Sequence, residues 1–237
     1  MLTLLFASLF LASCSDYGSK IEATGGTVYY KDGISEESAQ KVTDFLSEEN
    51  FFSENGDKRS VQLQQDDNKI THMNFVVKED YLDNPSTQAL LYTLGFQTAF
   101  TVLNLDTLNI NLCDNHFKTE KVMPIGIYKF GENAMVYTDA VKKSEAIDIS
   151  NFMISSNNIL EDAGFVFVID KESNTYQLKL ASREGAETDA NIVANVTMLS
   201  LDISHHVLND QPINFWFLDN GLNMKRVINY QDMVSNE

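Results

Sequence analysis

The sequence predicts an α+β protein of two tandem homologous modules, each a mainly antiparallel sheet with two helices on one face. The segment 109–122 recurs as 214–227, and each copy reads as a strand, a turn beginning Asp-Asn, and a second strand carrying a basic residue and a valine. A chain of 237 residues is long for one compact domain and suits two of about a hundred residues each. Its composition, 43% hydrophobic and 11% aromatic, predicts packed cores.

The first residues predict a targeting segment rather than part of the fold. Residues 2–12 form an uninterrupted run of apolar and small residues, which is too short to span a bilayer and is typical of the apolar region of a signal peptide. No Lys or Arg precedes the run, as one usually does. We therefore expect a signal peptide over residues 1–13 and a flexible tether over residues 14–25, which contain several Gly and polar residues.

The apolar run ends in Leu-Ala-Ser-Cys14, which resembles the lipobox of bacterial lipoproteins. The resemblance implies that Cys14 becomes a lipid-modified first residue and that the lipid anchors the protein to a membrane. Ser15 after the cysteine, rather than aspartate, implies the outer membrane more than the inner one. The membrane face stays open, and the alternative is an ordinary secretory peptide with an incidental cysteine.

The first module is expected over residues 26–128. A strand at 27–30 precedes a helix with Ser35 as N-cap and an apolar stripe. The stripe consists of Ala39, Val42, Phe45 and Leu46. A hairpin over 61–77, a helix over 88–103 and a closing hairpin over 108–124 complete the module.

The second module, residues 129–237, repeats this order. Val136-Tyr137 corresponds to Val28-Tyr29, and the helical stripe recurs at the same spacing as Ala146, Ile149, Phe152 and Met153. A hairpin over 165–180, a helix over 192–207 and a hairpin over 214–230 around Asn220-Gly221 follow. Each module resembles a ferredoxin-like βαββαβ unit with an added final strand, although the sequence leaves the strand order open.

Several motifs of the first module also resemble an uncharacterised bacterial domain. They are a Tyr-Tyr strand, the segments Ser-Val-Gln-Leu at 60–63 and Phe-Val-Val-Lys at 75–78, and Leu-Cys-Asp at 112–114. The second module fits loosely, because Leu218 replaces the cysteine and Ser-Val-Gln-Leu is lost. The resemblance implies no activity and no catalytic residue.

The charge and the scattered polar residues predict no nucleic-acid partner, metal, cofactor or catalytic site. A net charge of −17 without a basic stretch repels phosphate backbones. His205 and His206 are adjacent on a helix and point about 100° apart, so they cannot share one site with Asp202. The acidic turn at 66–68 is typical of Asx turns rather than of calcium loops, and Cys113 is expected to be a buried apolar thiol.

The repeated strand carries the strongest candidate surface. In the first copy the apolar side chains alternate with Asn109 and Asn111, so only one face of the strand is apolar. In the second copy Trp216 and Leu218 lie opposite the two phenylalanines, so both faces favour burial. Either the companion module covers Trp216 and Leu218, or they form an interaction surface for a partner.

These observations favour a non-enzymatic, lipid-anchored protein of the cell envelope that serves as an interaction or structural module. Its partners would be the membrane, through the lipid on Cys14, and another envelope protein. The alternatives are a carrier that binds a small molecule or ion in the groove between the modules, and a hydrolase. A pocket with converging polar groups favours a carrier or an enzyme, whereas a shallow apolar patch around Trp216 favours the interaction module.

Overall fold

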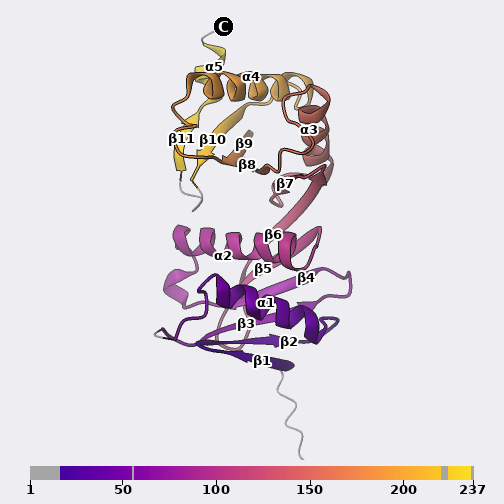
Figure 1. The fold of residues 1–237 in the computed structure, drawn as a ribbon, viewed down its shortest axis with the longest axis vertical. Coiled ribbons are helices and arrows are strands. Elements are labelled where there is room, and N and C mark those ends of the chain that lie inside the picture. The colour runs from indigo at the N-terminus through magenta and orange to yellow at the C-terminus, as the bar shows by residue number, and fades with distance from the viewer. Residues whose placement is uncertain (1–16, 55, 220–223, 236–237) are drawn as a thin grey trace, which may run out of the picture.

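The strands within the described residues form a single mixed sheet of 11 strands whose order in space is their order in the chain (Figure 1). The structure is a computed structural model that describes residues 17–54, 56–219 and 224–235. The predicted α+β architecture of two repeated units is confirmed. The signal peptide, the lipobox, Ser15 and the Asn220-Gly221 turn lie outside the described residues.

Both modules have the predicted order of elements, βαββαββ. The first consists of β2 (Gly26–Tyr30), α1 (Glu36–Glu48), β3 (Arg59–Gln65), β4 (Thr71–Val76), α2 (Pro85–Gln97), β5 (Thr107–Cys113) and β6 (Thr119–Phe130). The second consists of β7 (Asn133–Tyr137), α3 (Lys143–Ser155), β8 (Val166–Glu172), β9 (Thr175–Ala181), α4 (Ala190–His206), β10 (Ile213–Leu218) and β11 (Met224–Ile228). Further elements are β1 (Ser19–Ala23), the short 3₁₀ helix η1 (Glu79–Tyr81), the short π-helix η2 (Thr98–Val102) and α5 (Tyr230–Val234).

The register of the sheet reproduces the repeat read from the sequence. Asn111 pairs with Val122 across β5 and β6, and Trp216 pairs with Val227 across β10 and β11. The helical stripes also agree, since Ala39, Val42 and Leu46 of α1 are buried and their counterparts in α3 are buried at the same spacing. These counterparts are Ala146, Ile149 and Met153.

Two details of the sequence interpretation were wrong. Ser19–Ala23 is not part of a tether but forms β1, which pairs antiparallel with β2 across a tight turn with Gly25 at a φ of 84°. The proposed match of Val136 with Val28 is off by one residue. In the first module Val28 pairs with Val61 on the helix-covered face. In the second module the corresponding residue is Met135, which pairs with Phe167 and belongs to the core.

Parallel strands are direct neighbours in this sheet, so the resemblance to a ferredoxin-like unit ends at the order of elements along the chain. The pair β2 and β3 runs antiparallel to the pair β4 and β5, while the chain advances through the sheet in one direction. Both connecting helices pack into the same core. The two crossovers of the module must therefore have opposite hands, and one departs from the usual right-handed rule.

The helix layers of the two modules cover opposite faces of the continuous sheet. Strand β6 pairs with β5 and with β7, and along the β6–β7 pairing the side chains alternate between two cores. Ile127 and its partner Val136 belong to the core of the first module, whereas Tyr137, opposite Gly126, belongs to the core of the second. In Figure 1, α2 accordingly lies between the strands of the first module and those of the second.

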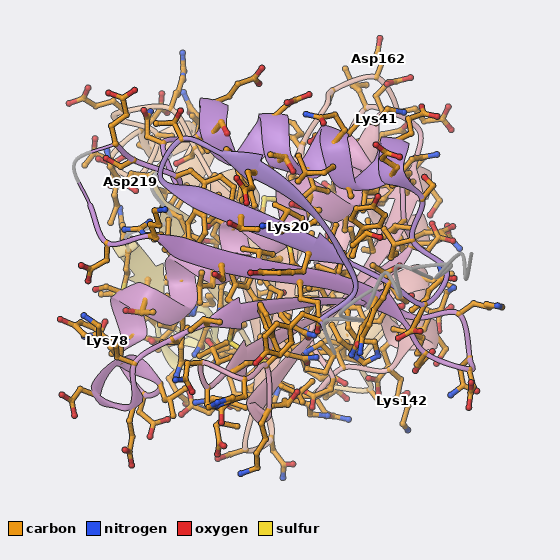
Figure 2. The ribbon with its side chains drawn as sticks, turned by 90° about the horizontal axis from the view of Figure 1, so that it is seen from below. Lys20, Lys41, Lys78, Lys142, Asp162 and Asp219 are labelled. Carbon is orange, nitrogen blue, oxygen red and sulfur yellow. The ribbon has the colours of Figure 1, made fainter. Side chains whose placement is uncertain are left out.

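The outer surface carries charges of both signs. Seen from below (Figure 2), Lys78, Lys142 and Asp162 lie at the periphery, and Lys20 lies over the strands of the first module. Exposed ion pairs such as Lys78 Nζ to Asp57 Oδ2 at 3.1 Å contribute little to stability because water screens them. The folded state therefore depends on its two apolar cores.

The joint between the modules tolerates no side chain at Gly126. A Cβ atom there would lie 2.1 Å from Cζ of the buried Tyr137 ring. We expect Gly126→Ala to lower the free energy of unfolding by about 1–3 kcal/mol, the usual cost of overpacking, measured by urea denaturation. Gly56→Ala is the matched control, because the nearest atom to its Cβ would be 3.8 Å away. Equal stability of the two variants would show that the ring is free to move.

Candidate functional site

A groove of about 530 Å³ lies between α2 of the first module and the sheet of the second. Its helical wall is made by Pro85, Gln88, Ala89 and Tyr92. Its other wall comes from β8, β9 and β10, with Val122 to Pro124 of β6 at the joint and Met224 of β11 at the rim. The volume lies in the range of about 300–1,000 Å³ that is typical of small-molecule sites.

Helix α2 can form this wall because only one of its faces packs against its own sheet and another faces the second module. Leu91, Leu94 and Gly95 are buried against the first sheet, where a Cβ at position 95 would meet Ile110 at 2.4 Å. The groove residues of α2 recur at intervals of three and four, so they lie on a single stripe of the helix surface. The helix therefore contacts its own sheet on one side and faces the second module on the other.

Trp216 and Leu218 both line the groove, on the face of β10 opposite the buried Phe215 and Phe217. Leu218 is buried, whereas Trp216 is partly exposed. The indole Nε1 of Trp216 donates a hydrogen bond of 2.6 Å to Oε1 of Gln177. This bond fixes the indole edge.

Charged groups stand beside the indole on the strand wall. Asp170 Oδ1 accepts hydrogen bonds from Thr138 Oγ1 at 2.6 Å and from the backbone N–H of Lys171 at 2.8 Å. Lys179 Nζ lies 3.6 Å from Asp170 Oδ2 and 5.6 Å from the centroid of the Trp216 ring. Asp139, in the turn after β7, adds an exposed carboxylate.

Tyr92 brings a polar atom to the helical wall. Its hydroxyl oxygen is buried and has no hydrogen-bond partner among the described residues. Burial raises the pKa of Tyr92 above its usual range, and the negative charges of Asp170 and Asp139 raise the pKa further. The phenol of one module therefore lies within the electrostatic reach of two carboxylates of the other, and it stays protonated at neutral pH.

The corresponding face of the first module has diverged. Asn111 occupies the place of Trp216, and its Nδ2 donates to Asn74 Oδ1 at 2.7 Å. Asn74 Nδ2 in turn donates to Gln62 Oε1 at 2.9 Å, so amide hydrogen bonds connect three strands. That face is polar, whereas the groove face is apolar with a few charges.

Sequence reasoning identified Trp216 and Leu218 but missed Tyr92, Asp139, Asp170 and Lys179. The spacing of Pro85, Gln88, Ala89 and Tyr92 was a readable signal for a second helix face. The charged residues gave no such signal, because their convergence depends on the tertiary arrangement. Cys14 lies outside the described residues.

The histidines occupy separate places. His206 stacks on Phe152 at 5.6 Å between ring centroids, and His205 Nδ1 lies 2.5 Å from Asp210 Oδ1. His72 Nδ1 lies 3.1 Å from Asn111 Nδ2 in the amide network of the first module. No group of three or more His, Cys, Asp or Glu that could hold a metal occurs in the part of the chain that the structure describes.

The acidic turn expected to be an Asx turn has that geometry. Asp66 Oδ1 accepts hydrogen bonds from the backbone N–H groups of Asn68 at 2.9 Å and Ile70 at 2.8 Å. These bonds, above all the one from Ile70, lower the pKa of Asp66. The carboxylate thus stabilises the β3–β4 hairpin.

Cys113 is fully buried in β5, as predicted. Burial raises the pKa of its thiol to about 11, although a contact with Thr119 opposes the shift. In a Cys14→Ser background we expect a thiol reagent at neutral pH to label folded Cys113 at least about a hundredfold more slowly than the urea-unfolded chain. The reason is that the raised pKa keeps the thiol protonated and burial keeps the reagent from reaching the sulfur. Equal rates would contradict the burial of this sulfur.

No helix within the described residues is long and apolar enough to cross a membrane. Residues 20–123 match a family model described as a family N-terminal domain, whose function is unknown. The matched region begins in β1 and ends within β6, so it corresponds to the first module. No curated protein and no solved structure matches the chain. The expected resemblance of the first module to an uncharacterised domain is confirmed at this level.

Proposed function

We propose that the chain is a non-enzymatic binding protein that holds a small molecule in the groove between its two modules. The observation that carries the proposal is the convergence of Tyr92 from the first module and Trp216 from the second on one groove of about 530 Å³. Apolar walls with a few oriented polar groups are typical of ligand sites, because apolar burial provides affinity and the polar groups orient the ligand. This was the second of the functions inferred from the sequence.

The shape of the site favours a small ligand over a protein partner. Trp216 is partly buried in a concave site beside α2, whereas an indole that anchors a protein interface commonly stands on an accessible patch. Val166 and Val168 of β8 pack against the core of the first module, which supports a fixed spacing between the two walls. A preformed groove of this kind loses little conformational entropy when a ligand binds.

The hydrogen bonding of Asp170 supports binding rather than catalysis. Its carboxylate accepts two hydrogen bonds and faces Lys179, so it is held as a structural acceptor rather than presented as a free general base. A hydrolase remains the third proposal, for which Asp139 would be the accessible carboxylate.

We propose further that the protein acts in the cell envelope, anchored through lipid on Cys14, and at the outer rather than the inner membrane. The support is the sequence Leu-Ala-Ser-Cys14 after an apolar run, followed by Ser15. The first strand of the fold begins at Ser19, so a lipid on Cys14 would hold the folded chain close to the membrane.

A groove-filling substitution tests the binding proposal. Ala89 is exposed on the groove face of α2, so Ala89→Trp adds a bulky side chain to the groove without disturbing either core. We expect the neutral fluorescent probe N-phenyl-1-naphthylamine to bind the wild-type protein with one-to-one stoichiometry, and this variant to lose at least about tenfold in affinity through steric exclusion.

Ala190→Trp is the matched control, because Ala190 is exposed at the start of α4 and is not among the residues that line the groove. It should bind the probe like the wild type, and both variants should unfold at the wild-type urea concentration. Undiminished probe binding by Ala89→Trp would place the probe elsewhere and remove the support for a groove ligand.

The anchor has its own test. Cys14→Ser should abolish metabolic labelling with a radioactive fatty acid and release the protein from the membrane fraction, because the lipid cannot be attached to serine through a thioether. Cys113→Ser is the control for the loss of a thiol, and it should keep both label and attachment. Membrane attachment of Cys14→Ser at the wild-type level would refute the lipoprotein proposal.

A further inference from the structure

We infer that the groove selects an organic cation, namely an amine with a short apolar body, over neutral and anionic ligands of the same size. The inference rests on the proposed function, because it assigns the chemical class of the ligand that occupies the same groove. It is carried by the convergence of Asp139, Asp170, Tyr92 and Trp216 on one largely apolar groove.

The charges in the groove leave one carboxylate without a counter-ion. The lining contains two acidic residues, Asp139 and Asp170, and one basic residue, Lys179. Lys179 Nζ faces Asp170 at 3.6 Å, whereas no ion pair of Asp139 is found among the residues that the structure describes. The groove therefore has a local negative charge on a chain whose net charge is already −17, and both fields favour a cationic ligand.

Trp216 offers the surface that a cation prefers. The face of an indole ring attracts ammonium groups within about 6 Å of the ring centroid. Lys179 Nζ already lies 5.6 Å from that centroid, so the environment of this ring accommodates a positive charge. A ligand ammonium near the same ring would have Asp139 as its own counter-ion.

Tyr92 supplies the hydrogen-bonding atom. Its hydroxyl oxygen is buried and unpaired among the described residues, and a phenol oxygen can accept a hydrogen bond from an ammonium N–H. Tyr92, Asp139 and Asp170 line the same groove, and the charges of both carboxylates raise the pKa of the Tyr92 phenol. An ammonium placed there would satisfy a polar atom that otherwise remains unpaired, which is an unfavourable state.

The rest of the lining determines the body of the ligand. Val168, Leu218 and Met224 form an apolar wall on the strand side, opposite Ala89 of the helix. A short alkyl or aryl group buries apolar area against these residues, and each buried methylene contributes to affinity. A carboxylate ligand would be repelled by the uncompensated charge of Asp139 and could pair only with Lys179, which already faces Asp170.

The fluorescence of Trp216 reports the occupancy of the groove, because it is the single tryptophan of the chain. We would titrate the full chain with hexylammonium, hexan-1-ol and hexanoate, which share one alkyl body and differ in charge. Hexylammonium should perturb the emission at the lowest concentration, with an apparent affinity about tenfold above that of hexan-1-ol, and hexanoate should bind most weakly. The preference should shrink as salt is added.

Two variants that each remove one negative charge test which carboxylate causes the preference for hexylammonium. Asp139→Asn should remove most of the preference for hexylammonium over hexan-1-ol while leaving hexan-1-ol binding unchanged. Asp162→Asn removes the same charge at an exposed position at the periphery, and it should retain the preference (Figure 2). Tyr92→Phe, which keeps the ring but loses the oxygen, should weaken hexylammonium more than hexan-1-ol.

The outcomes distinguish the claim that the groove selects a cation from the claim that the groove binds a ligand. Equal binding of hexan-1-ol and hexylammonium, or tighter binding of hexanoate, would overturn the cation assignment and keep the groove as a binding site. A preference that Asp162→Asn removes as fully as Asp139→Asn would also overturn it, since the net charge alone would then explain the result. Unchanged Trp216 emission with all three probes would overturn both the assignment and the proposed function.

Discussion

The pairing of β6 with β7 is the constraint on which the rest of the structure depends. Neighbouring side chains along a strand point to opposite faces of the sheet, so this pairing assigns Ile127 and Val136 to one core and Tyr137 to the other. The helix layers consequently cover opposite faces, and α2 lies between the two sets of strands. The groove follows from this arrangement, because the face of the second module that its own helices leave open is the one that α2 approaches.

The two modules pack their helices in the same way, but the sheet faces that their own helices leave uncovered differ. In the first module the amide side chains of Gln62, Asn74 and Asn111 are buried and hydrogen-bond to one another across neighbouring strands. The Gln62 amide also donates to the backbone carbonyl of Tyr17. In the second module Trp216 at the corresponding place requires an apolar neighbour, which the groove provides. The buried stripes of α1 and α3 therefore correspond, whereas the opposite face of the sheet carries Asn111 in the first module and Trp216 in the second.

The sequence was sufficient to predict most of the fold, because its signals are local. The Ser35 cap, the stripe of Ala39, Val42 and Leu46, and the Asp66 turn all formed as predicted. Strand order was not predictable, since parallel neighbours are joined by long crossovers that give no register signal. Only part of the strand side of the candidate site could be predicted from the sequence. Trp216 interrupts the apolar–polar alternation of its strand and could be identified, whereas Tyr92 lines the same groove only because of how the second module follows β6.

The agreement between sheet order and chain order has a consequence for how the protein folds. Each strand hydrogen-bonds only to strands that directly precede or follow it in the sequence, so no pairing must wait for a non-consecutive strand. The turns between antiparallel neighbours such as β3 and β4 are short and cost little entropy to close, whereas each parallel pair also closes a crossover that contains a helix. The sheet can therefore extend one strand at a time from the amino terminus, so a chain emerging from a ribosome or a translocation pore would shield each new edge as it forms.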